Sequence, residues 1–86
     1  MEKRVALMGI IVEDKEMVEQ LNKILHEYSS YIIGRMGIPY REKNISIISV
    51  AIDAPMDLIN SLSGKIGKLK NISVKTSCSN WVSGNE

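Results

Sequence analysis

The segment Ile32–Glu42 concentrates residue types that could do chemistry, because two glycines, a proline, two arginines and a tyrosine cluster within it. Arg35 lies among apolar neighbours there, and a guanidinium in such surroundings requires a carboxylate or phosphate partner. We predict that Arg35 binds an anionic group, with Tyr40 and Arg41 at the rim of the same loop. The alternatives are a salt bridge across a subunit interface, or a tight hairpin that the glycines and the proline merely shape.

Metal binding and catalysis have less support in the residue types. His26 and Cys78 are the one histidine and the one cysteine of the chain, and they lie far apart in the sequence. A single chain cannot build a metal site from this pair, although several copies could bring them together. The simpler interpretation is an exposed helical histidine and a small hydrophobic cysteine. No nucleophile or carboxylate pair has a supporting partner, so we predict neither a metal site nor an enzyme.

Length and composition set the scale of the fold. The chain has 86 residues and a net charge of +1, with 44% hydrophobic residues but only 5% aromatic residues and no Phe. That length allows one domain with an aliphatic core, and a lone copy buries only about 60–65% of its unfolded surface. One cysteine excludes an internal disulfide, and no apolar run approaches the roughly 20 residues of a membrane span. We therefore expect a cytoplasmic protein without a general affinity for membranes or nucleic acid.

Hydrophobic periodicity predicts the elements that must position these residues. Helical spacing runs from about Lys15 to Ser29, after the N-cap candidate Asp14. A second helix begins at Pro55 and carries apolar residues as far as Leu69. The predicted strands are the apolar or alternating segments 5–12, 32–38, 45–52 and 72–78.

The resulting βαββαβ order predicts an α+β fold, a ferredoxin-like sandwich with a four-stranded antiparallel sheet. In this topology the sheet order is 4-1-3-2 and both helices cover one face. We assign residues 1–78 to a single domain and predict that residues 79–86 form a flexible C-terminal tail.

Both central strands are apolar on both of their faces, whereas one layer of helices covers only one face of the sheet. The other face would show more aliphatic surface than a soluble monomer normally exposes, so we predict that it packs against another copy as a homodimer or homotetramer. The alternative is that the tail folds over this face. The residues that we assign to the oligomer interface are Met8, Ile10, Val12, Ile48, Val50 and Ile52.

RNA recognition motifs share this element order, but they stack bases on aromatic side chains of the central strands. The equivalent positions here are not aromatic: Leu7, Gly9, Ile11, Ile45, Ile47 and Ser49. Segments 34–37 and 64–67 imitate the Gly-x-x-Gly loop of KH domains, but that loop joins two helices and these segments do not. Nucleic-acid binding through the basic segment 65–75 is therefore an alternative function that depends on its lysines alone.

Several short runs together resemble a small bacterial family, the iron-only hydrogenase system regulators. They are the run RMGIPYRE at residues 35–42, LSGKIG at residues 62–67, VKT at residues 74–76 and the helix entry at residues 12–14. The resemblance covers about residues 2–76.

This resemblance implies an ACT-like fold, similar to the C-terminal ligand-sensing domain of nickel-responsive repressors. Such domains associate through their sheets and often bind a small regulatory ligand at the interface, near the turn from the first strand to the first helix. Glu13 and Asp14 at that turn are therefore further candidate ligand-binding residues. Hydrogenase maturation proteins become possible partners, either of a ligand sensor or of a ligand-free adaptor. Nickel sensing is not implied, because His26 and Cys78 cannot reproduce a cluster of several histidines and a cysteine.

Overall fold

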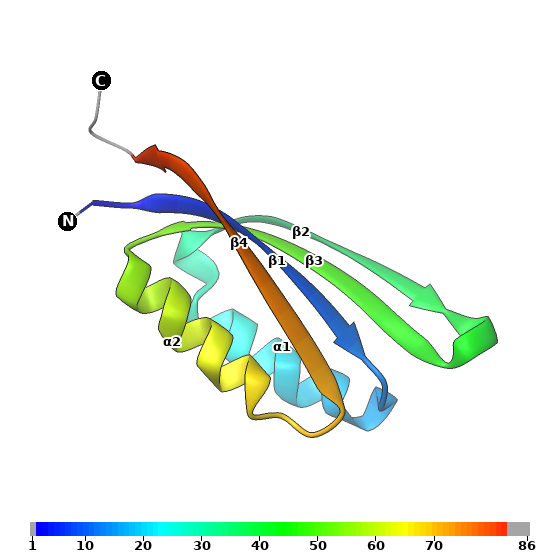
Figure 1. Cartoon of the computed structure of the whole chain (residues 1–86). Coiled ribbons are helices and arrows are strands. Elements are labelled where there is room, and N and C mark those ends of the chain that lie inside the picture. The colour runs from blue at the N-terminus through cyan, green and yellow to red at the C-terminus, as the bar shows by residue number, and fades with distance from the viewer. Residues whose placement is uncertain (1, 83–86) are drawn as a thin grey trace.

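A computed structural model describes residues 2–82, of which residues 81 and 82 are described by their backbone alone. Four strands form one antiparallel sheet in the order β2-β3-β1-β4. Two helices lie together on one side of this sheet (Figure 1). The predicted ferredoxin-like α+β fold and its strand order are thus confirmed. The strands are β1 (Arg4–Val12), β2 (Ile32–Tyr40), β3 (Ile45–Ala54) and β4 (Ile72–Val82), and the helices are α1 (Val18–Glu27) and α2 (Met56–Gly67).

The first helix is shorter than its apolar pattern predicts. Its predicted first residues form the separate 3₁₀ turn η1 (Lys15–Met17), where the carboxylate of Asp14 accepts a hydrogen bond from the backbone N–H of Glu16 at 3.0 Å. That contact satisfies one of the N–H groups left without a partner at a helix start. A second 3₁₀ turn, η2 (Ser29–Tyr31), leads from α1 into β2.

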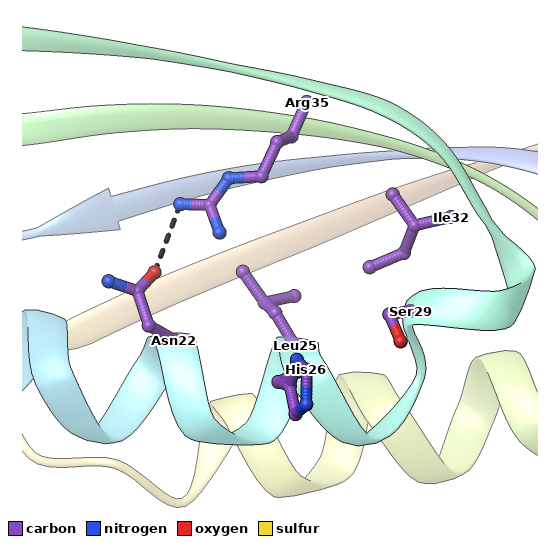
Figure 2. A pocket seen from close by; sticks show the side chains of 6 residues that line it. All are labelled: Asn22, Leu25, His26, Ser29, Ile32 and Arg35. Carbon is purple, nitrogen blue, oxygen red and sulfur yellow. Dashed lines mark hydrogen bonds between the residues drawn. The ribbon is translucent and has the colours of Figure 1, made fainter.

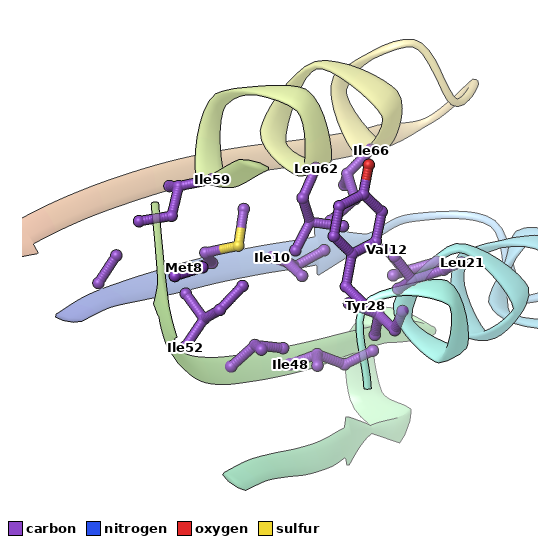
Figure 3. Packing of buried hydrophobic residues seen from close by; sticks show 14 residues of the cluster. Met8, Ile10, Val12, Leu21, Tyr28, Ile48, Ile52, Ile59, Leu62 and Ile66 are labelled. Carbon is purple, nitrogen blue, oxygen red and sulfur yellow. The ribbon is translucent and has the colours of Figure 1, made fainter. Parts of the chain in front are cut away.

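The hydrophobic core lies between the helices and the sheet, as Figure 3 shows. Each helix contributes the apolar stripe that its periodicity predicts, because residues three and four apart share one face of a helix. The fully buried helical residues are Leu21, Leu25, Ile59, Leu62 and Ile66. Tyr28 is also buried, and its hydroxyl lies 2.9 Å from the Ser61 hydroxyl, which joins the end of α1 to α2.

The prediction for the oligomer interface is wrong about which face of the sheet is open. All six predicted interface residues point toward the helices and are at most 4% exposed: Met8, Ile10, Val12, Ile48, Val50 and Ile52. Alternation along a strand separates two faces but does not say which one the helices cover. The helices cover the more continuously apolar set, whereas Gly9 and Ser49 interrupt the apolar run in the middle of the opposite face.

The start of the predicted C-terminal tail is also corrected. Residues 79–82 continue β4, and Val82 lies opposite Arg4 after a register shift between Arg4 and Ala6. The strand extends because the long β1 offers backbone hydrogen-bond partners along its whole length. The remaining residues of the predicted tail, 83–86, lie outside the described residues.

Candidate functional site

The side of the sheet turned away from the helices carries a cluster of exposed apolar side chains. Leu7 on β1 is 54% exposed and Met36 on β2 is 61% exposed. The strand register places these residues together, because Leu7 pairs with Ala51 and Met36 pairs with Ser49 on the intervening β3. We call this surface the open face and define its apolar part as Leu7, Ile11, Met36, Ile38, Tyr40 and Ile47.

Small residues beside these side chains leave hollows in the open face. One hollow of about 260 Å³ is lined by Gly34, Ser49 and Ala51 together with Leu7, Arg35 and Met36. A second, of about 290 Å³, lies on the other side of Leu7 and extends to β4. On the open face, projecting apolar side chains therefore alternate with depressions. Closely packed protein surfaces fit together when the projections of one surface fill the depressions of the other.

A separate groove of about 250 Å³ lies between α1 and β2 (Figure 2). Arg35 extends from β2 toward α1, where its Nη2 donates a hydrogen bond to Oδ1 of Asn22 at 3.0 Å. Leu25 and Ile32 extend into the space between the strand and the helix. The remaining residues that line the groove are His26 and Ser29, on the helix side.

Arg35 faces this groove because of a β-bulge in β2. Ile32 pairs with Ile52 and Arg35 pairs with Val50, so both lie on the helix side of the sheet although they are separated by an odd number of positions. The register shift at Ile33 makes this possible, because a bulge places two residues opposite one and reverses the alternation.

The structure separates Arg35 from the two residues that were expected to share its site. Tyr40 lies on the open face, opposite Ile45, and its hydroxyl donates to Oε2 of Glu42 at 3.3 Å. Arg41 lies in the 3₁₀ turn η3 (Arg41–Lys43), beyond the end of β2. Five residues of strand span about 16 Å, so Arg35 and Tyr40 face opposite sides of the sheet at a considerable distance. The prediction of one site containing all three is wrong.

Glu13 and Asp14 lie at the turn between β1 and η1, as predicted. The backbone N–H of Glu13 donates to the carbonyl oxygen of Asn71 at 2.9 Å, which ties this turn to the start of β4. The Asp14 carboxylate caps η1. Both residues thus have a structural role here, and neither lines the groove that contains Arg35.

His26 is exposed on α1, as the sequence indicates, but it lies at the groove together with Asn22 and Ser29. The sequence prediction for the site of Arg35 does not include these residues. Their spacing of four and three positions would have placed them on one face of a helix, which is the signal that could have found them. Within residues 2–82, no three His, Cys, Asp or Glu side chains gather in a way that could hold a metal ion.

The basic segment 65–75 does not form a single surface. Lys75 lies on the open face, because it pairs with Gly9. Lys65 extends from α2, and its Nζ lies 5.1 Å from the centre of the Tyr28 ring. A hydrogen bond with Tyr28 and the negative charge of Glu27 raise the pKa of Lys65 above its ordinary value of 10.5. The helix layer separates this lysine from the open face, so the arrangement gives little support to one nucleic-acid footprint.

Comparison with known proteins places the chain in a family. Residues 4–76 match the TM1266-like family model, which is described as "Iron-only hydrogenase system regulator, putative". The chain belongs to this family. The resemblance noted in the sequence is thereby confirmed. A solved member, the uncharacterized protein TM1266 from Thermotoga maritima, is 36% identical with a TM-score of 0.85, over 88% of this chain and 96% of that chain.

Two other solved structures share the fold of this TM1266-like chain. A formyltetrahydrofolate deformylase from Pseudomonas putida KT2440 is 11% identical with a TM-score of 0.66, over 90% of this chain and 29% of that chain. The divalent ion tolerance protein CutA1 from Ehrlichia chaffeensis is 15% identical with a TM-score of 0.50, over 92% of this chain and 84% of that chain. At these identities the likeness concerns the fold alone. A comparison with curated protein sequences finds no match.

Proposed function

We propose that the protein is a non-enzymatic regulatory module of the iron-only hydrogenase system that acts in the cytoplasm as a homo-oligomer and senses a small ligand. Membership of the TM1266-like family supports the link to that system. The observation that carries the assembly is the open face, where large apolar side chains remain exposed on three neighbouring strands. No helix in the described part of the chain is long and apolar enough to cross a membrane.

A second copy is the occupant that best suits the open face. Four strands about 4.8 Å apart, with nine residues of about 3.3 Å each, give a sheet face of roughly 30 by 19 Å. Its planar area of about 570 Å² approaches the roughly 800 Å² of accessible surface that each partner buries in a standard interface. The projecting Leu7 and Met36 lie next to hollows at small residues. A two-fold axis can seat such projections of each copy in the hollows of the other.

The few charges on the open side are also compatible with a second copy. Asp53 alternates with the buried Ile52 and Ala54 and therefore lies on the open side of β3, and Lys75 lies on the open side of β4. The carboxylate of Asp53 and the ammonium of Lys75 have opposite charges, so a second copy can place them opposite each other across the interface.

Ligand sensing would then follow from linkage. A ligand that binds the assembled form better than the separate protomers shifts the population toward the assembly by its difference in affinity. The regulated partners that we propose are hydrogenase maturation proteins, which would distinguish the two states.

Sedimentation velocity at micromolar concentrations tests the assembly. We expect the unchanged chain to sediment as a dimer or larger species, and we expect Leu7→Glu to sediment as a monomer because it places like charges in the interface. Asn60→Glu adds the same charge to an exposed position of α2, away from the sheet, and is the matched control. A monomeric wild-type chain at every concentration would refute the assembly, and equal effects of the two substitutions would refute the open face as its location.

A further inference from the structure

The groove between α1 and β2 has the composition of a small binding site. Its lining combines the guanidinium of Arg35, the imidazole of His26, the amide of Asn22 and the hydroxyl of Ser29 with the apolar side chains of Leu25 and Ile32. Ligand sites commonly join a mainly apolar wall to a few polar groups that fix orientation. At about 250 Å³ the groove suits a molecule of a few carbon atoms rather than a nucleotide.

The polar groups of the groove are arranged to donate hydrogen bonds. Arg35 uses one N–H toward Asn22, and a guanidinium has five such donors in a planar fork. Asn22 presents its oxygen to Arg35, which leaves its own NH₂ group available for another acceptor. Ser29 can donate through its hydroxyl, and a neutral His26 has one ring N–H. An acceptor with two oxygens would satisfy several of these donors together.

The charge of Arg35 is not matched by a carboxylate. Its hydrogen-bond partner is the neutral amide of Asn22, and no acidic side chain lines the groove. In the described residues no ion pair involves Arg35, although acidic residues such as Glu19 and Glu27 lie on the same helix. A cation held at the rim of an apolar groove, with donors around it, favours an anionic ligand.

We propose that this groove binds a small organic acid, with its carboxylate on the Arg35 fork and its short aliphatic part against Leu25 and Ile32. This assignment rests on the proposed sensing function, for which it names the site and the ligand class. Inorganic phosphate shares the anionic chemistry, but it has no apolar part to fill the space above Leu25 and Ile32. The groove therefore prefers the organic acid.

Titration of the ¹⁵N-labelled full chain with acetate, propionate and butanoate, followed by amide chemical shifts, tests this proposal. Sodium chloride at equal ionic strength and inorganic phosphate are the comparison anions. We expect shifts that saturate and are concentrated at residues 22–35, with affinity rising along the acid series. Complete burial of the chain would raise the affinity about fourfold for each added methylene, and an open groove would raise it less.

Substitutions distinguish specific binding in the groove from nonspecific attraction of anions to positive charge. Arg35→Met removes the fork, and we expect it to weaken butanoate binding by about tenfold, the effect of losing a charged hydrogen bond. Arg35→Lys keeps the charge but cannot donate two parallel hydrogen bonds to a carboxylate. Its affinity for butanoate should therefore lie between those of the wild type and Arg35→Met. Arg41→Met removes another exposed arginine, which lies outside the groove, and leaves butanoate binding unchanged. Amide spectra with native dispersion show that each variant is folded.

Besides the absence of binding, three results would overturn the assignment. They are shifts that chloride reproduces, an equal loss in Arg35→Met and Arg41→Met, and binding of phosphate as tight as that of butanoate without dependence on chain length. Sedimentation in the same buffers keeps the two proposals apart. If the protein is a dimer that binds no acid, the proposal of acid binding in the groove is refuted and the assembly stands. If it is a monomer that binds butanoate, the proposed assembly is refuted and the binding site stands.

Discussion

Leu7 and Met8 are neighbours on β1 but lie on opposite sides of the sheet, and this contrast gives a direct test of the face assignment. Met8 is fully buried, so Met8→Ala leaves a cavity and costs about 2–5 kcal/mol of unfolding free energy. Leu7 is 54% exposed, so somewhat less than half of its side chain is covered in one protomer. Because complete burial of a leucine contributes about 1.5–3 kcal/mol, we expect Leu7→Ala to cost about 1 kcal/mol in a single protomer.

Urea unfolding followed by circular dichroism, at several protein concentrations, measures both effects. At the lowest concentrations, where the midpoint no longer depends on concentration, the two variants should differ by at least about 1 kcal/mol. At higher concentrations the midpoint of the wild type rises if a second copy covers Leu7, since assembly stabilises the folded state. In Leu7→Ala the midpoint should increase less with protein concentration.

Ile66→Ala is the control for a core truncation on α2 instead of β1, because Ile66 is also fully buried. It should resemble Met8→Ala in dilute solution. An equal cost of Leu7→Ala and Met8→Ala at the lowest concentration would show that the open face is already covered in one protomer. The reasoning about exposed aliphatic side chains would then be refuted.

Three further predictions concern the helices and one turn. Tyr28→Phe removes the hydrogen bond to Ser61 and should lower the unfolding free energy by about 0.5–1.5 kcal/mol in urea unfolding; a neutral result would mean that water replaces the bond fully. The pKa of Lys65 is raised when the chain folds, by Tyr28 and Glu27, so its stabilising effect is complete below pH 10.5 and lost as pH rises through the folded value. Melting temperatures of wild type and Lys65→Met should therefore converge at alkaline pH, and a constant gap would contradict the shift. Asn44 has φ 57°, so Asn44→Ala should cost about 1 kcal/mol in thermal unfolding while Asn44→Gly is neutral, and equal melting of the two would exclude strain.

The fold could be predicted because its elements depend on local patterns. The apolar stripe of α1 has the period of a helix, and the apolar run of β1 is too short for a helix and is bounded by charged residues. Strand order then followed from the sequence of elements, since this topology has few alternatives. It was harder to predict from the sequence which face of the sheet the helices cover. Met8 and Leu7 belong to two apolar sets, and the exposed set differs from the buried one mainly by its interruptions at Gly9, Ser49 and Asp53.

The groove could not be predicted, because it depends on a single inserted residue. Ile32 pairs with Ile52, and an unbroken antiparallel register from that pair would place Arg35 opposite Ser49, on the open face. The bulge at Ile33 instead moves Arg35 opposite Val50, and its side chain turns toward α1. Two alternating strands carry no sequence rule that fixes where such a bulge falls. The identity of Arg35 thus indicated anion chemistry, while the backbone register alone determined which surface received it.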